Sequence, residues 1–156
     1  MNAPMCKAVF LFGVSACTLL GSSLTLGLNT GGNSFPFAGP YDDYPGTRYQ
    51  EANAATDFSG PISVTRIDFF VQAGEGGDLY AATYTLSLST VTADINSLSN
   101  TNFNNNLGPD NTVFDSVALS GAAPSELTFT GSPFNYNPAD GNLLLDIQIV
   151  GGNGVL

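Results

Sequence analysis

The sequence predicts an all-β protein, an antiparallel β-sandwich of the jelly-roll type, on three observations. Apolar and polar residues alternate along several short segments, which is the period of a half-buried strand. Clusters of Gly, Pro, Asn and Asp separate these segments. No segment shows a helical apolar period longer than about two turns. Roughly seven short strands joined by turns are typical of a sandwich.

The first segment, residues 1–23, predicts an export signal. Lys7 is its single charge, and residues 8–20 form a mostly apolar run that is too short to cross a bilayer comfortably. Gly21 and Ser23 provide the small residues that a signal peptidase selects, so we expect cleavage after Ser23. Residues 24–156 then form a single domain, since this length suits one domain better than two.

Two other interpretations of this segment remain open. The residues "VSAC" resemble a bacterial lipobox, in which Cys17 would be lipidated and become the first mature residue. Alternatively, the apolar run is a buried N-terminal strand. Both cysteines, Cys6 and Cys17, lie in the segment, so with either cleavage we expect no disulfide within the mature domain.

The first half of the domain begins with a short alternating segment at 24–28 and a loop at 29–47 that is rich in Gly and Pro. Residues 48–60 have mixed character. Residues 61–73 predict a strand whose apolar residues change parity, since Ile62 and Val64 are followed by Ile67, Phe69 and Val71. A β-bulge near Thr65 and Arg66 would bring all five to one face. Alternatively both faces are covered, which would accommodate Phe70.

The middle of the chain contains the longest alternating run, at residues 79–91. One face of this strand is expected to be buried and the other to be a solvated face of Thr and Ser. The buried set is Tyr80, Ala82, Tyr84, Leu86 and Leu88. Residues 92–99 predict one helical turn capped by Thr92, with Ile95 and Leu98 directed inward. An Asn-rich loop follows at 100–111.

The last third predicts three more strands. In residues 112–119 the alternating set is Val113, Asp115, Val117 and Leu119, and in residues 126–131 Leu127 and Phe129 face inward. After a turn containing Asp140 and Gly141, the final strand directs inward Leu143, Leu145, Ile147 and Ile149. Asp146 and Gln148 then point to solvent, and Leu144 needs cover from a loop or from another strand. The sequence stops soon after this strand, and a final strand at a sheet edge would leave backbone groups unpaired, so we expect a fragment.

The charge balance excludes several classes of function. The chain has three basic residues against thirteen acids and a net charge of −10, so it cannot neutralise a nucleic acid or an anionic membrane. It contains no His, which excludes His-dependent nucleophilic triads and His-containing zinc sites, and no Trp. Beyond Lys7, the basic residues are Arg48 and Arg66, and we expect each to pair with a nearby acid.

The acidic residues favour structural turns over chemistry. Those expected in turns are Asp42, Asp43, Glu75, Asp78, Asp110 and Asp140, none of them in a calcium-loop motif. A bound calcium is the alternative, and we predict no metal and no cofactor. Three acids lie within expected strands, Asp68, Asp115 and Asp146, where their neighbours direct them to solvent. We therefore predict no catalytic residue and a protein that is not an enzyme.

Aromatic residues form the remaining candidate site. Tyr41, Tyr44 and Tyr49 are the predicted ligand-binding residues, because tyrosine rings close together in a loop can stack on a sugar or on a partner protein. Phe35 and Phe37 lie in the same region. The alternative is that these rings close over the end of the sandwich core.

Several segments resemble one bacterial family. They are "TRYQEANAATDFSGPISVTRIDFF", "YTLSLSTV", "LSNTNFNNNLGPDNTVF" and "FNYNPADGNLLLDI". Together they are similar to exported proteins that carry the PEP-CTERM sorting tag. The resemblance implies export and association with the cell surface or extracellular matrix, and it supplies no catalytic residues. The Pro-Glu-Pro tail of that family is absent from this sequence.

The sequence as a whole predicts an exported envelope or matrix protein with a structural or adhesive, non-catalytic role. Its expected partners are extracellular polysaccharide or other surface proteins, with no nucleic acid and no transmembrane segment in the mature chain. The alternative is a glycan-binding module that uses the 41–49 loop.

Overall fold

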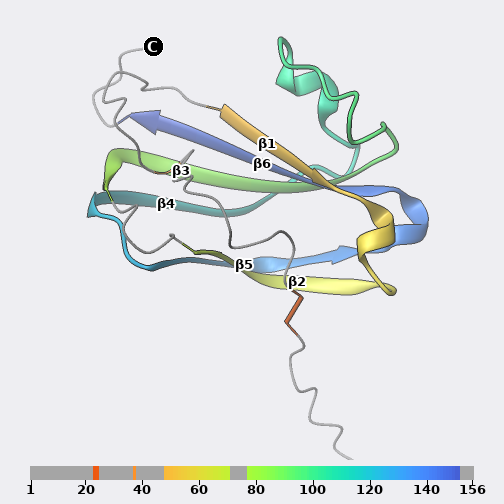
Figure 1. The fold of residues 1–156 in the computed structure, drawn as a ribbon, viewed down its shortest axis with the longest axis horizontal. Coiled ribbons are helices and arrows are strands. Elements are labelled where there is room, and N and C mark those ends of the chain that lie inside the picture. The colour runs from red at the N-terminus through yellow and green to blue at the C-terminus, as the bar shows by residue number, and fades with distance from the viewer. Residues whose placement is uncertain (1–22, 25–36, 38–47, 71–76, 152–156) are drawn as a thin grey trace, which may run out of the picture.

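The computed structural model describes residues 23–24, 37, 48–70 and 77–151, and within them the chain forms six strands (Figure 1). The strands are β1 (Arg48–Asn53), β2 (Ile62–Phe70), β3 (Asp78–Val91), β4 (Thr112–Ala122), β5 (Glu126–Tyr136) and β6 (Asn142–Gly151). Three short 3₁₀ turns accompany them: η1 (Ala55–Asp57), η2 (Phe103–Asn106) and η3 (Pro138–Asp140).

The strands form two antiparallel sheets packed face to face. A four-stranded sheet has the order β1-β6-β3-β4, and a two-stranded sheet contains β2 and β5. Figure 1 shows the smaller sheet lying below the larger one. The predicted all-β sandwich is therefore confirmed.

The core lies between the two sheets and is built from the alternating residues of the strands. In β6 the predicted inward set is buried, with Ile147 at 0% exposure and Ile149 at 2%. In β3 the predicted set is also inward, with Tyr84 and Leu86 fully buried. From the smaller sheet, Leu127, Phe129, Phe134 and Tyr136 complete the core.

The parity change in β2 is a bulge, as predicted. The register against β5 shifts between Val64 and Arg66, so that Ile62 and Val64 before the shift and Ile67 and Phe69 after it all pack against the core. Phe70 is 59% exposed, so the alternative of two covered faces is wrong. Val71 lies outside the described residues.

Strand β4 differs from its predicted pattern. Phe114 is buried, whereas Val113 is 53% exposed. The register with β3 shifts at this point, because Leu86 pairs with Asp115 and the next residue, Ser87, pairs with Val113. This irregularity turns Phe114 inward without changing the inward direction of Val117 and Leu119, which pack against the core. Simple alternation from Val113 was therefore the wrong interpretation.

Strand β6 lies in the interior of the larger sheet. It pairs with β1 on one side and with β3 on the other, so the final strand is not left at a sheet edge with unpaired backbone groups. Among the described strands of this sheet, β1 and β4 occupy the two ends of the order. The first part of β6 is covered on both faces, which explains why Leu144, on the face away from the core, is fully buried.

The segment of residues 92–111, which connects β3 to β4, lies over that outer face. In Figure 1 it stands above β1 and β6, on the side opposite to β2 and β5. The predicted helical turn at 92–99 is wrong. The Asp94 side chain instead accepts a hydrogen bond from the backbone N–H of Asn96, and Ile95 is 38% exposed.

The turn before β6 is held by its own polar groups. The Asn137 side chain caps η3 by accepting from the backbone N–H of Ala139, and the Tyr136 hydroxyl donates to the carbonyl of Gly141 at 2.6 Å. Gly141 has a φ of 142°, and a Cβ there would lie 2.5 Å from the carbonyl oxygen of Val91. Glycine is therefore required at this position for both reasons. Asp140 ends η3 with its side chain exposed.

Other expectations fall outside the described residues. They include the export signal up to residue 22, the lipobox at Cys17 and most of the 24–28 strand, of which Leu24 is described and exposed. Within the described ranges, the structure has no helix with the length and apolar character needed to cross a membrane.

Candidate functional site

The most organised polar cluster in the described part of the chain surrounds Asp146 of β6. The side chain of Asp146 lies on the outer face of the larger sheet and is 1% exposed. Arg48, on the neighbouring strand β1, binds both carboxylate oxygens. Its Nε donates to Oδ1 at 2.7 Å and its Nη2 donates to Oδ2 at 3.0 Å. Such two-pronged pairs are the strongest protein ion pairs, because both groups are planar and fully charged.

Two glutamines complete the hydrogen bonding of this carboxylate. Gln50 Nε2 donates to Oδ1 at 2.9 Å, and Gln148 Nε2 donates to Oδ2 at 3.2 Å. Each oxygen of Asp146 thus accepts two hydrogen bonds. A buried carboxylate is tolerated only when it is paired and saturated in this way.

The segment of residues 92–111 is tied to this cluster. Asn106, itself buried, donates from Nδ2 to Gln50 Oε1 at 2.7 Å, and Gln50 also donates to the carbonyl of Phe103 at 3.1 Å. Arg48 Nη1 donates to Asn104 Oδ1 at 2.7 Å, and its guanidinium lies 5.7 Å from the centre of the Phe103 ring. We call the set Arg48, Gln50, Asn106 and Asp146 the Asp146 network.

The C-terminal part of the same segment is fixed to β3. The Asp110 carboxylate accepts from the backbone N–H of Thr90 at 2.7 Å, and the N–H of Gly108 donates to Ser89 Oγ at 3.2 Å. A Cβ at Gly108 would fall 2.0 Å from the carbonyl oxygen of Thr90. The segment therefore lies directly on the strand, and Ser87 and Ser89 are buried beneath it instead of forming the solvated hydroxyl face that was predicted along all of β3.

The prediction for Asp146 was partly wrong. The residue points away from the core, as alternation requires, but it is buried by the 92–111 segment and not solvated. The sequence signal was Leu144, two residues earlier, whose apolar side chain on the same face requires cover. Gln50 and Asn106 were missed because isolated amide side chains in polar segments are usually exposed.

Of the three tyrosines of the predicted ligand-binding site, the structure describes Tyr49. Tyr49 lies on β1 opposite Ile147, on the core side of the sheet, and is half-buried. Its hydroxyl donates to Glu51 Oε2 at 3.0 Å. Burial, together with the negative charge and the hydrogen bond of Glu51, raises the pKa of Tyr49 to about 12. Tyr41 and Tyr44 lie outside the described residues, as does Phe35.

Phe37 is the described aromatic residue of the preceding loop, and it packs into the core. Its ring centre lies 4.6 Å from that of Phe69 and 5.9 Å from those of Tyr84 and Phe129. The side chain is 8% exposed. At this position the ring closes the core, which is the alternative that the sequence left open.

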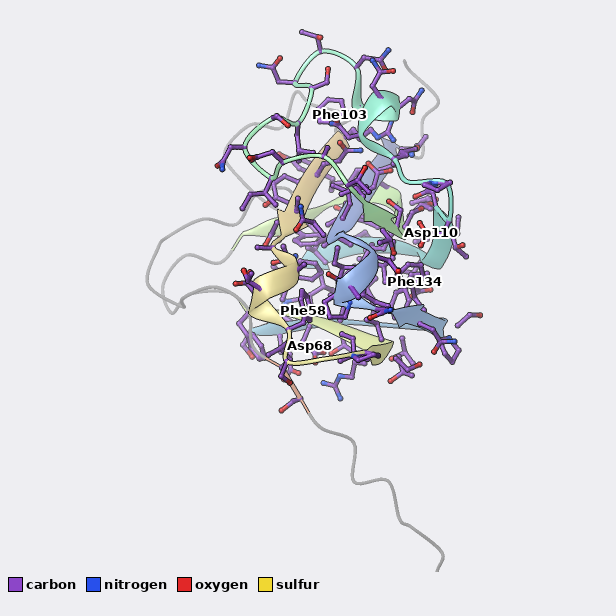
Figure 2. The ribbon with its side chains drawn as sticks, turned by 90° about the vertical axis from the view of Figure 1, so that its right-hand side faces the viewer. Phe58, Asp68, Phe103, Asp110 and Phe134 are labelled. Carbon is purple, nitrogen blue, oxygen red and sulfur yellow. The ribbon has the colours of Figure 1, made fainter. Side chains whose placement is uncertain are left out.

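A second ion cluster lies on the outer face of the smaller sheet. Arg66 donates to Asp68 at 2.8 Å and to Glu126 at 2.6 Å, so both arginines pair with acids as expected. The net effect on Asp68 is a lowered pKa. Its slight burial alone would raise the pKa, but the hydrogen bonds from Arg66 and Thr128 and the charge of Arg66 outweigh that effect. Figure 2 shows Asp68 at the end of the molecule opposite to Phe103. Exposed pairs of this kind carry little functional information.

The described acids of the turns have structural positions. Asp110 accepts from the backbone of β3, Asp78 begins that strand with an exposed side chain, and Asp140 ends η3. Within the described ranges, no three acidic residues lie close enough together to hold a metal ion. Asp42, Asp43 and Glu75 lie outside those ranges.

Comparison with known proteins gives no match for this chain. No family model, no curated protein and no solved structure matches it.

Proposed function

We propose that this chain is an exported protein of the bacterial envelope or extracellular matrix, with a structural or adhesive role that involves no catalysis. The proposal rests on the sequence features of an export signal and on the resemblance to the PEP-CTERM group. It also rests on the hydroxyl-rich and amide-rich surface that accompanies a charged content of 10%.

The bonding of Asp146 is the observation that carries the non-catalytic part of the proposal. A carboxylate buried to 1% exposure is the kind of group that an enzyme would use as an acid or base. Here both oxygens are occupied by Arg48, Gln50 and Gln148, and the cluster fixes a connecting segment to the sheet. The ion pair of Asp146 thus serves to hold the connecting segment on the sheet, which suits a protein with a structural or adhesive role.

Localisation and attachment test this function together. In a bacterium that produces the chain, antibody should label intact cells or the extruded matrix, and deletion of the gene should reduce attachment of cells to a surface. Expression of the full chain in trans should restore attachment. Retention of the chain in the cytosolic fraction, or normal attachment of the deletion strain, would contradict the proposal.

A glycan-binding module that uses the 41–49 loop is the second candidate, favoured by Tyr49 at the end of that loop, which is only half-buried. A half-buried tyrosine bonded to the exposed Glu51 combines a ring with a hydrogen-bonding carboxylate, which is how sugars are commonly held. A glycan array probed with the whole chain and with its Tyr49→Ala and Tyr49→Phe variants tests this site. Loss of binding in the alanine variant, with binding kept in the phenylalanine variant, is the expected pattern.

A further inference from the structure

The outer face of the larger sheet has a part that the 92–111 segment leaves exposed. Two rows of residues cross three adjacent strands there. Thr83 of β3 pairs with Ala118 of β4 and with Val150 of β6, and Thr85 pairs with Ser116 and Gln148 in the next row. We call the six residues Thr83, Thr85, Ser116, Ala118, Gln148 and Val150 the hydroxyl face.

The side chains of the hydroxyl face are accessible and partly ordered. Five are exposed and Thr85 is half-buried, with Val150 at 50% exposure. Thr85 Oγ1 and Ser116 Oγ lie 2.9 Å apart and share a hydrogen bond across the strands. Gln148 Nε2 donates to Asp146, which fixes the amide, while its Oε1 has no donor among the described residues. The surface therefore presents preorganised polar groups, which lowers the entropic cost of binding.

The hydroxyl face is electrically neutral in a protein of net charge −10. None of its six side chains is ionisable, and the adjacent Arg48 is neutralised by Asp146. Among the other described acids, Asp115 lies beside the face, where its carboxylate accepts a hydrogen bond from the backbone N–H of Ser116 at 2.7 Å, whereas Asp68 and Glu126 lie on the opposite sheet. Six adjacent side chains without an ionisable group, in so acidic a chain, are the feature that requires an explanation.

We propose that the hydroxyl face binds a neutral polysaccharide, an inference that rests on the proposed matrix function and names its partner. Sugar hydroxyls match the hydroxyl and amide groups, and Ala118 and Val150 can contact the C–H faces of the rings. An anionic polymer would be repelled by the net charge of the chain. A protein partner would require large aromatic or arginine anchors, which the six residues lack.

Weak contacts of this kind become effective by repetition. A single sugar unit binds weakly to a flat polar surface. A polymer offers many equivalent units, so that several copies of the chain can bind to it at once. The inference therefore predicts binding to insoluble polymers and little binding to short oligosaccharides.

Co-sedimentation of the purified chain with cellulose and with an insoluble β-1,3-glucan tests the inference. The double variant Thr83→Glu, Ser116→Glu adds two charges to the hydroxyl face and should weaken binding at least tenfold. The matched control is Ser63→Glu, Thr130→Glu, since both residues are exposed on the outer face of the smaller sheet. The control should sediment like the unmodified chain, and both variants should keep its circular dichroism and urea midpoint.

Three results would overturn the inference: no sedimentation of the unmodified chain with either polymer, equal losses in the two double variants, or loss with Tyr49→Ala in place of the hydroxyl-face variant. The outcomes also separate the inference from the function on which it rests. A deletion strain that loses attachment, combined with a chain that binds neither polymer, would leave the proposed function standing and remove this partner. Polymer binding by the chain, combined with normal attachment of the deletion strain, would support this partner and contradict the proposed function.

Discussion

Replacement of Arg48 by leucine should destabilise the domain strongly, because it leaves Asp146 as a buried charge without its cation. At 1% exposure the carboxylate cannot recover the lost interaction from water. Removing one partner of a buried ion pair typically costs ~3–5 kcal/mol. Two of the four hydrogen bonds, those from Gln50 and Gln148, remain in the variant. We therefore expect a loss near the lower limit, about 3 kcal/mol, out of the ~5–15 kcal/mol that stabilises a domain.

Urea unfolding followed by circular dichroism and tyrosine fluorescence measures this loss, since the chain has no tryptophan. With an m-value of ~1–3 kcal/mol/M, the midpoint should fall by about 1–3 M. The double variant Arg48→Leu, Asp146→Leu removes the unpaired charge, so its effect should be smaller than the sum of the two single effects by about 1–3 kcal/mol. Arg66→Leu, which breaks an exposed cluster, is the control and should change the midpoint little. A loss below about 1 kcal/mol for Arg48→Leu, or simple additivity in the cycle, would refute this account of Asp146.

Three further predictions concern the core, the last turn and the tyrosines. Leu145→Ala should cost ~2–5 kcal/mol in urea unfolding, and a loss within about 0.5 kcal/mol would contradict the inward assignment of β6. Gly141→Ala should cost at least ~1 kcal/mol because of its positive φ and the close carbonyl, whereas Gly60→Ala, with open space around it, serves as the neutral control. Because the folded pKa of Tyr49, about 12, exceeds its ordinary value near 10, the neutral hydroxyl contributes stability that is fully present below about pH 10 and is lost as the pH rises toward 12. Absorbance at alkaline pH should show a lower pKa for Tyr49 in a Glu51→Gln variant, and an unchanged titration would exclude Glu51 as a cause.

The sequence predicted those parts of the fold that follow from alternation along one strand. The inward residues of β6 and the bulge in β2 could be read directly, because burial against a single core imposes a period of two. The prediction for β4 was wrong at Phe114. An irregularity in pairing depends on the partner strand, so it cannot be recognised from the alternation that begins at Val113.

The Asp146 network could not be predicted for a different reason. The part of its cover that bonds to it comes from the Asn-rich loop at 100–111, which carries no apolar period and attaches to the sheet by side-chain amides. The sequence distance between Asp146 and Asn106 gives no sign that the two side chains share a partner in Gln50. Leu144 showed that some cover must exist, but nothing in its pattern identified the segment that provides it.

The interior position of β6 has a consequence for the order in which the protein can fold. The described pairing of β1 is with β6 alone, and Arg48 meets Asp146 across 98 positions of the chain. The larger sheet therefore cannot assemble until nearly all of the described chain has left the ribosome, and each of its long-range contacts carries the cost of closing a long loop. Slow folding of this kind keeps a nascent chain unfolded for longer, which suits the proposed export, because secretion channels thread unfolded chains.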